Sequence, residues 1–332
     1  MSAWATAFQS GTVVWDWFIA IYLFLAGMSA GAVMISIYLK RKVIDGDPAN
    51  NGVLKATAFL APFGIISGLL ILVFHLTKPL SFWKIMIFYN PTSVMSMGVI
   101  LFQVYMVILF VWIGIIFRNQ IAVFLSDQAW LKGRLDFVSN WIGKLESFEN
   151  AFEIFLAVLA LLLALLLALL LAAYTGFLLS ALNTFPMLNN PVLPILFLFS
   201  SLSSGAAACI LFGVLVFKES PHSASISWIH GFERPVVMFE LFVLVTFLTG
   251  LVFAGGQSEQ AVCNAIGSGF WASWFWYGVI GVGMVLPLLL NAVTPTSVRH
   301  STVYIFSVTS LSLMGVLMLR TFVLYAGQLT LA

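Results

Sequence analysis

The residues of this chain best suited to chemistry are ionisable and phenolic side chains set into long apolar stretches. They are Asp16, Tyr22, His75, Glu153, Tyr174, Glu240 and Arg320. A charged group inside hydrocarbon is costly, and such groups are usually kept for binding or proton transfer. Phenol, imidazole and guanidinium groups can each donate a hydrogen bond to a carbonyl oxygen. The set therefore predicts a site for a small polar headgroup, with groups that can pass protons to it.

Five of these residues are expected at similar depth near the outer ends of their helices: Asp16, Tyr22, His75, Tyr174 and Arg320. Each also has an ordinary explanation. Tyr22 fits an interfacial aromatic belt, and Arg320 fits a side chain that snorkels to the headgroups. Asp16 and His75 fit hydrated residues at headgroup level, and Tyr174 fits packing as well as a buried hydrogen bond. Their shared depth is what favours a common site.

The two glutamates are expected on the other side, near the inner ends of their spans. Glu153 is close enough to water to be ordinary, whereas Glu240 is the stronger functional candidate. Because carboxyl groups exchange protons readily, both are candidates for proton transfer from the cytoplasm. Asp16 is the corresponding candidate on the outer side.

The composition excludes a soluble protein. Of the 332 residues, 62% are apolar and 8% are charged, against about 25% charged residues in soluble domains. The net charge of +2 gives no basic surface for nucleic acid. The N-terminal stretch has no basic region of the kind that begins a signal peptide, so the first apolar run is expected to remain as a helix.

The apolar stretches predict an all-α integral membrane protein. A membrane-spanning helix needs about 20 apolar residues, because its backbone groups must be paired internally. Eight stretches meet this requirement: residues 18–39, 56–76, 94–117, 154–182, 192–217, 236–254, 270–290 and 301–325. The fourth is long enough that it must tilt or project beyond the bilayer.

The distribution of Lys and Arg sets the orientation. Of the 14 such residues, all but Lys78, Lys84 and Arg320 fall in the loops after the first, third, fifth and seventh spans. Cytoplasmic loops carry the excess of positive charge. Both termini are therefore predicted on the periplasmic side of a bacterial inner membrane. Residues 126–149, which mix charged and aromatic side chains, predict an amphipathic helix on the cytoplasmic interface in preference to a plain polar linker.

Two short segments resemble one another. LFLAGMSAGA at residues 23–32 and FLFSSLSSGA at residues 197–206 each carry a ladder of small residues, Gly27 with Gly31 and Ser201 with Gly205. This spacing lets helix backbones approach closely. The simplest architecture is two four-helix bundles, residues 1–182 and 183–332, related by a parallel pseudo-repeat. Chance is the alternative, because such ladders are common in membrane helices.

The sequence offers no ligands for a metal redox centre. Of the four histidines only His75 lies in or near a predicted span, and the others fall in predicted cytoplasmic loops. A membrane-bound haem needs facing axial histidines, and an iron–sulfur cluster needs more cysteines than Cys209 and Cys263. We therefore expect neither group in this chain. If it moves electrons, it must do so through a bound organic carrier and a partner protein.

Several segments together resemble the NrfD/PsrC-type membrane subunit, the quinone-interacting anchor of polysulfide reductase and related molybdoenzyme complexes. They are WFIAIYLFLAGMSAGA at 17–32, His75-Leu-Thr-Lys78-Pro79, Phe82-Trp83, Asn90-Pro91-Thr92-Ser93, Met95-Ser96, Tyr174-Thr-Gly176, Leu202-Ser-Ser-Gly205-Ala, and Arg320 with Gly327-Gln328. Each segment is weak alone, but their joint order is specific and extends over most of the sequence.

The resemblance implies eight helices in two bundles and a quinone site near the outer face, with menaquinone expected in preference to ubiquinone. It also implies a docked ferredoxin-like iron–sulfur subunit and a molybdopterin catalytic subunit. Tyr174 matches the family tyrosine that hydrogen-bonds a quinone carbonyl. Tyr22 occupies the first-helix position of its polar partner, which is a histidine in some members. His75 stands where many members have Asp, so an imidazole replaces a carboxylate at this position.

The resulting hypothesis is a quinone-reactive subunit of an oxidoreductase complex, not catalytic alone. Tyr174, with Tyr22 or His75, would hold the headgroup, and Arg320 would stabilise its anionic form or pair with a carboxylate. Two alternatives come from other classes. One is a secondary transporter, disfavoured because the ionisable groups are expected at the two faces and not at the midplane. The other is a purely structural anchor, which would leave the outer polar cluster without a purpose.

Overall fold

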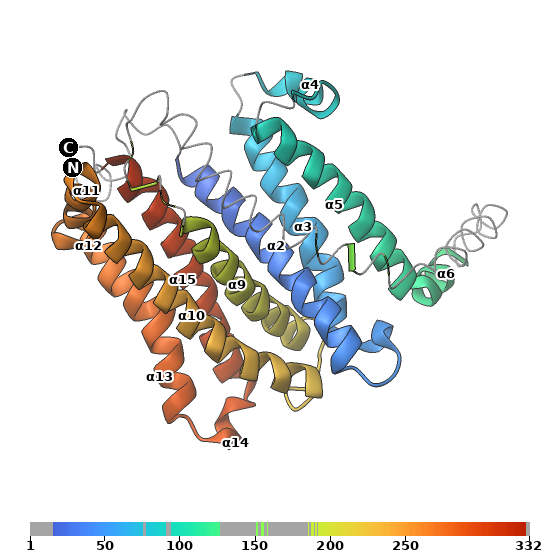
Figure 1. Cartoon of the computed structure of the whole chain (residues 1–332). Coiled ribbons are helices and arrows are strands. Elements are labelled where there is room, and N and C mark those ends of the chain that lie inside the picture. Colours follow the sequence, from blue (N-terminus) through green and yellow to red (C-terminus); the bar gives the residue numbers. More distant parts are fainter. Residues whose placement is uncertain are drawn as a thin grey trace.

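A computed structural model describes residues 16–75, 78–90, 94–126 and 192–329, together with single positions between 151 and 190. Every regular element within these ranges is a helix (Figure 1). The predicted fourth span and the predicted interfacial helix lie outside the described residues, apart from a few positions. The all-α prediction is confirmed for the described part of the chain.

The first half of the described sequence is built on α2, α3 and α5. The bounds are α2 Trp17–Lys42, η1 Pro48–Asn50, α3 Gly52–His75, η2 Pro79–Ser81, α4 Phe82–Ile87, α5 Val94–Ile116 and α6 Arg118–Ser126. Asp16 caps α2, because its Oδ1 accepts the Phe18 N–H at 3.1 Å. Lys40, Arg41 and Lys42 in the last turn of α2 complement the negative end of the helix dipole.

The second half is built on α9, α10, α15 and the helical column between α11 and α14. The bounds are α9 Leu193–Leu215, α10 Ala224–Ala254, α11 Gly256–Gly267, α12 Phe270–Ser273, η4 Trp274–Val285, α13 Leu286–Val293, α14 Thr296–Arg299 and α15 Thr302–Leu329. The element η4 is a π-helical stretch that continues α12 into α13. Where it passes α15, a Cβ on Gly283 would lie 2.6 Å from the Cα of Gly315, so both positions require glycine.

Six described helices are long and apolar enough to cross a membrane, and the chain is a multi-span membrane protein. They are Trp17–Lys42, Gly52–His75, Ile195–Leu215, Ala224–Ala254, Phe270–Val293 and Thr302–Gln328. They correspond to the predicted first, second and fifth to eighth spans, and α5 coincides with the predicted third. The count of eight stays a prediction.

One boundary was predicted wrongly. The sixth span was expected to begin at Val236, but α10 begins at Ala224, with Ser223 Oγ accepting the Ile226 N–H at 3.4 Å. Pro235 lies inside this helix, so the loop expected before it is helical. His230, which was assigned to a cytoplasmic loop, therefore lies on α10.

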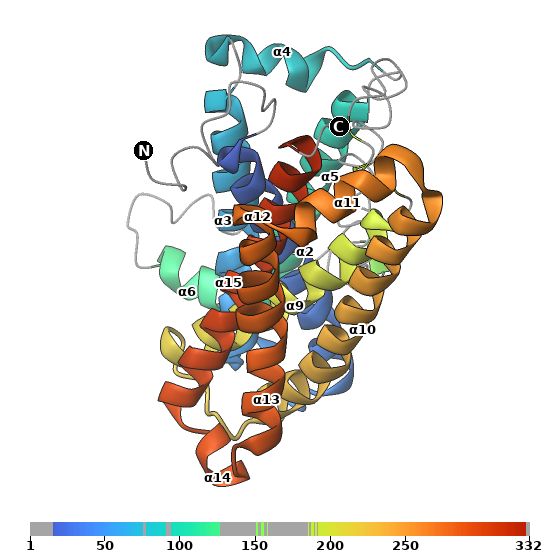
Figure 2. The same cartoon turned by 90° about the vertical axis from the view of Figure 1, so that its left-hand side faces the viewer.

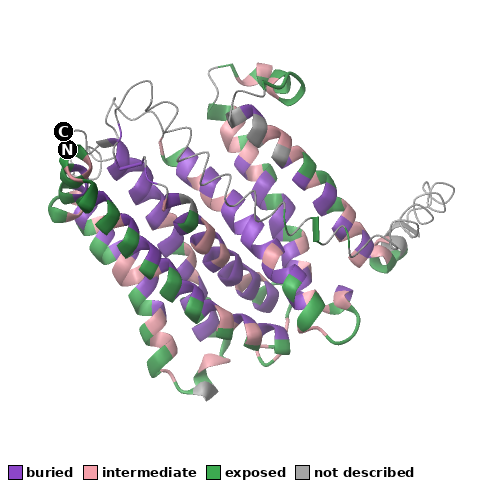
Figure 3. Cartoon of the chain, in the orientation of Figure 1, coloured by how far each residue is buried: buried purple, intermediate pink, exposed green. Residues whose placement is uncertain are grey.

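The two predicted ladders of small residues pack against each other. A Cβ on Gly31 would overlap the backbone oxygen of Ser201, and one on Gly205 would overlap the backbone of Gly31 and Ala32. Helices α2 and α9 thus touch backbone to backbone, as the small-residue spacing predicted. Both are central in the molecule (Figures 1 and 2) and mostly buried (Figure 3). The close approach is confirmed, while the pseudo-repeat and the two-bundle division stay predictions.

Candidate functional site

An apolar pocket lies between α3, α4 and α5, close to the end of α3 at which the periplasmic face is predicted. Its volume is about 610 Å³, which is within the range of about 300–1,000 Å³ typical of small-molecule sites. Leu69 and Val73 of α3, Met86 of α4 and Phe102 of α5 are among its lining residues, with Gln103 as a polar group. The lining of the pocket is therefore almost wholly apolar.

The Gln103 side chain is held by two hydrogen bonds. Its Oε1 accepts from the hydroxyl of Tyr89 at 2.5 Å, and its Nε2 donates to the backbone oxygen of Met86 at 3.2 Å. These bonds join α5 to α4 and to the residues that follow α4. Sequence reasoning missed Gln103, because a single neutral amide in an apolar helix carries no charge signal.

Tyr22 lies behind the wall of the pocket. Its side chain is buried, and its ring centroid is 6.2 Å from that of Phe102, which lines the pocket. A Cβ on Gly68 of α3 would lie 3.2 Å from the Tyr22 ring, so this glycine makes room for the phenol. The burial of Tyr22 argues against a lipid-facing belt residue, and its role in binding stays a prediction.

Asp16 and His75 lie together at the outer ends of α2 and α3. The His75 Nδ1 is 3.9 Å from the Asp16 Oδ2, and each side chain is about one third exposed. The Phe18 ring lies beside the imidazole, with centroids 6.2 Å apart. Val73, which lines the apolar pocket, is two residues before His75. The pair is thus open to solvent and adjacent to the pocket.

Arg320 is deeply buried, which excludes the snorkelling explanation. The side chain is 1% exposed. Its Nη1 donates to the backbone oxygen of Leu23, and its Nη2 donates to Ser200 Oγ at 3.1 Å and Ser201 Oγ at 2.9 Å. A Cβ on Gly27 would lie 2.5 Å from the Arg320 Nη2, so a larger residue there would displace the guanidinium. Arg320 therefore joins α15 to both α2 and α9.

Glu240 is the electrostatic partner of Arg320 in the interior. Its side chain is 2% exposed, and its Oε1 has no hydrogen-bond partner among the described residues. The two charges interact electrostatically, with no hydrogen bond between them. Glu240 was expected near the inner end of its span, and its depth in the membrane stays a prediction. Because α10 begins at Ala224, Glu240 lies near the middle of the helix.

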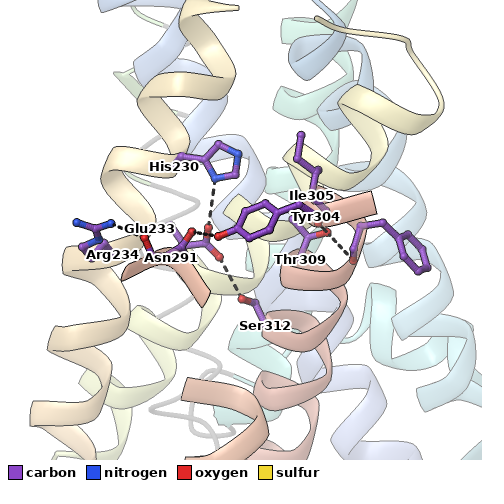
Figure 4. A network of polar contacts seen from close by, with 9 residues as sticks. His230, Glu233, Arg234, Asn291, Tyr304, Ile305, Thr309 and Ser312 are labelled. Atoms are coloured by element: carbon purple, nitrogen blue, oxygen red, sulfur yellow. Dashed lines mark hydrogen bonds and ion pairs between the residues drawn. The ribbon is translucent and has the colours of Figure 1, made fainter. Parts of the chain in front are cut away.

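A second buried carboxylate lies on the same helix. Glu233 Oε1 accepts from Ser312 Oγ at 3.1 Å, and its Oε2 is 4.0 Å from the Nδ1 of His230 (Figure 4). Glu233 precedes Glu240 by seven residues, about two helical turns, so both lie on one face of α10. Sequence reasoning missed Glu233 because it was placed in a loop. The seven-residue spacing was the available signal.

With this geometry in view, the comparisons with known proteins assign the family. The family model described as Polysulphide reductase, NrfD matches residues 5–332. The chain belongs to the NrfD family. Protein NrfD of Escherichia coli K12 is 46% identical over 328 residues, which cover 98% of this chain and 99% of that protein.

Two further relatives of this NrfD-family protein have informative names, because each is named as one component of a reductase. The polysulfide reductase component of Wolinella succinogenes is 38% identical over 325 residues, covering 98% of each protein. The selenate reductase component of Mesobacillus selenatarsenatis is 24% identical over 291 residues, covering 84% of this chain and 67% of that protein. The family resemblance predicted from the sequence is confirmed.

In this NrfD-family protein the predicted site residues fall into two groups. Asp16, His75 and Tyr22 lie around the apolar pocket, although none of the three is among its lining residues. Arg320 and Glu240 lie deeper, among α2, α9, α10 and α15. Leu23, which binds Arg320, follows Tyr22 directly, so α2 separates the two groups. Tyr174 and Glu153 lie outside the described residues.

Proposed function

We propose that this chain is the quinone-binding membrane subunit of a respiratory oxidoreductase complex. Two relatives are named as components of a polysulfide reductase and of a selenate reductase, which supports a role as one subunit among several. The observation that carries the proposal is the apolar pocket of about 610 Å³ beside the Asp16–His75 pair. Menaquinone is the expected quinone in preference to ubiquinone.

The residues of the pocket fit a quinone in shape and polarity. Leu69, Val73 and Phe102 supply an apolar slot for the ring and tail. The carbonyl oxygens need hydrogen-bond donors, for which Tyr22 and His75 are the candidates near the pocket, together with Tyr174. When bound, the quinone accepts or gives up two electrons and two protons.

Protons have two candidate routes. On the outer side, Asp16 and His75 are partly exposed and 3.9 Å apart, so they can exchange protons with solvent and pass them toward the pocket. On the inner side, Glu240 and Glu153 are the candidates. Glu233 would extend the route from Glu240 toward the cytoplasmic end of α10. Arg320 supplies a fixed positive charge between the routes, held by neutral oxygen atoms of α2 and α9.

Electrons would pass between the bound quinone and a ferredoxin-like iron–sulfur subunit docked on the outer face, with a molybdopterin subunit beyond it. This arrangement places the chain in a bacterial inner membrane with both termini periplasmic. The support is the excess of Lys and Arg on the opposite side of the helices. A spectroscopic search for haem or a cluster in the purified protein is expected to find neither.

Substitution of Leu69 by Trp tests the pocket. The larger ring would fill the slot, and overpacking of about 1–3 kcal/mol corresponds to a loss of roughly tenfold in quinol-linked turnover of the intact complex. Leu289→Trp is the matched control, because Leu289 is 54% exposed on α13, away from the pocket. Turnover with a soluble artificial electron donor should be unchanged in both variants. Normal quinol-linked turnover in Leu69→Trp would show that the quinone binds elsewhere.

Tyr174→Phe tests the residue assignment that rests on the family motif. It removes one hydroxyl and leaves the volume of the ring unchanged. We expect quinol-linked turnover to fall about tenfold, the value of one good hydrogen bond to the carbonyl. Unchanged turnover in the intact complex would remove Tyr174 from the site while leaving the pocket assignment in place.

A secondary transporter is the second candidate, and the pairing of two buried ionisable groups favours it. Glu240 lies near the middle of α10, and it interacts with the buried Arg320. Ionisable groups in the membrane interior are a feature of ion and proton pathways. The purified protein in liposomes, without redox partners, should move no solute if the quinone proposal is right.

A further inference from the structure

A second cavity opens at the other end of the helices, where the cytoplasmic face is predicted. It lies among α10, α13, α14 and α15, and its volume is about 320 Å³. Four basic side chains line it, His230, Arg234, Arg299 and His300, with the Tyr304 phenol beside them. Among the described residues that line it, none is acidic. A concave site with this lining attracts anions.

The two arginines keep most of their donors available. Arg299 Nε donates to the backbone oxygen of Thr294 at 2.8 Å, and one Nη of Arg234 donates to the backbone oxygen of Asn291 at 3.3 Å. These acceptors are neutral, so neither charge is compensated. The remaining guanidinium nitrogens have no partner among the described residues. A guanidinium group with available N–H donors can form two parallel hydrogen bonds to the oxygens of one phosphate group.

The two histidines line the cavity from the other sides. His300 Nδ1 donates to the backbone oxygen of Pro221 at 3.0 Å, so its Nε2 is an acceptor in the neutral ring and a donor only when the ring is protonated. The Nε2 of His230 is buried without a hydrogen-bond partner among the described residues, while its Nδ1 is 4.0 Å from Glu233 Oε2. Figure 4 shows the Tyr304 hydroxyl reaching Asn291 from the side of His230, while Arg234 reaches Asn291 from the opposite side. Glu233 Oε1 accepts from Ser312 Oγ, and its Oε2 has no hydrogen-bond partner among the described residues.

We propose that this cavity binds a phosphodiester, supplied by the headgroup of an anionic phospholipid such as phosphatidylglycerol. The apolar surface that continues from it favours a lipid over free phosphate. Val293 of α13 and Val303 of α15 are 80% and 77% exposed, and Phe306 is 52% exposed. Acyl chains would lie against these side chains while the phosphate enters the cavity. Basic pockets between helices on the cytoplasmic side are typical sites for anionic headgroups.

The bound lipid would join the start of α10 to the turn between α13 and α15. Arg234 belongs to the first of these segments, and Arg299 and His300 belong to the second. A ligand that binds the folded protein stabilises it by mass action. The site is independent of the quinone proposal, because it lies at the other end of the molecule and involves none of the pocket residues.

Titration of the purified full-length protein in detergent, followed by native mass spectrometry, tests the proposal. Dioleoyl-phosphatidylglycerol should bind more tightly than dioleoyl-phosphatidylcholine and raise the melting temperature. Arg299→Gln should weaken phosphatidylglycerol binding about tenfold, because a charge-assisted hydrogen bond is lost. The affinity of Arg299→Lys for phosphatidylglycerol should fall between those of the unchanged protein and Arg299→Gln. Lysine keeps the positive charge but lacks the paired N–H donors of a guanidinium group. Arg41→Gln, on the same face but outside the cavity, is the matched control and should bind normally.

Three results would overturn the proposal. The first is equal binding of phosphatidylglycerol and phosphatidylcholine, and the second is equal weakening by Arg41→Gln and Arg299→Gln. The third is an equal rise in melting temperature with sodium phosphate at matched concentration and ionic strength, which would make free phosphate the ligand. If Arg299→Gln fails to fold, Arg234→Gln provides the same measurement from an exposed side chain.

Discussion

Two cavities in the described part of the structure are lined by opposite kinds of side chain. The pocket between α3, α4 and α5 is about 610 Å³ and almost wholly apolar, whereas the cavity at the start of α10 is about 320 Å³ and basic. The first can select a ring by its shape, with few polar groups at the edge to orient it. The second can select by charge. Between them lies a buried layer of Arg320, Glu240 and close-packed glycines.

The largest expected effect is the loss of that layer's backbone contact. Gly31→Leu would drive a side chain into the backbone of Ser201, and we expect a cost of at least about 3 kcal/mol and little folded protein. Gly114→Leu is the matched control, since a Cβ there meets nothing within 4 Å. Fluorescence-detected size exclusion of both variants compares the yields. A normal yield of Gly31→Leu would contradict the α2–α9 contact.

The next largest effect concerns the buried charges. Arg320→Met should lower the free energy of unfolding by about 3–5 kcal/mol, because Glu240 and the oxygens of Leu23 and Ser201 lose their cation. Adding Glu240→Gln should restore part of this loss, since a neutral amide needs no cation. Thermal unfolding of the two single variants and the double variant gives the coupling. Strict additivity would show that the two groups do not act as a pair.

A smaller effect is expected on the apolar side. Tyr22→Phe should reduce quinol-linked turnover about three- to tenfold if its hydroxyl binds the quinone, with stability almost unchanged. Phospholipid binding at the basic cavity should stay the same, because the two sites use different contacts. Steady-state kinetics of the complex and lipid titration of the same preparation make the comparison. Loss of both activities together would mean that the substitution disturbs the fold.

The smallest effect separates the two roles of Asp16. Asp16→Ala removes the cap of α2 and should cost about 1 kcal/mol. Asp16→Asn keeps a capping oxygen and removes the charge beside His75, so its cost should be smaller. Thermal unfolding measures the contribution of the cap to stability. The pH profile of turnover measures the effect of the Asp16 charge on proton transfer. Identical pH profiles for Asp16→Asn and the unchanged protein would remove Asp16 from the proton route.

The sequence was sufficient to locate the helices that coincide with an uninterrupted apolar run. Apolar runs located α2, α3, α9 and α15 to within a few residues, because length and hydropathy decide a membrane span. The start of α10 was missed because Pro235 and its charged neighbours resemble a loop. In the structure Glu233 is buried and bonded to Ser312, a contact from a distant part of the sequence that no local pattern contains.

Of the candidate site, the sequence indicated the ionisable and phenolic residues but not the pocket beside them. The grouping of Asp16 with His75 followed from span direction alone, and so did the depth shared by Tyr22 and Arg320. That α2 stands between Tyr22 and Arg320 depends on the rotation of the helix, which is set by the glycine contacts with α9. The pocket itself is formed by ordinary apolar side chains, and only packing distinguishes these from any others.

Helix α2 presents neighbouring residues to the two groups on either side of it. Tyr22 points toward α3 and α5, and the carbonyl of Leu23 receives the Arg320 side chain. The helix contains no proline between residues 17 and 42, so its backbone hydrogen bonds run without a proline break. Because Tyr22 and Leu23 are adjacent on this one helix, a rotation of α2 at the Tyr22 side would also displace the oxygen atom that anchors the Arg320 guanidinium.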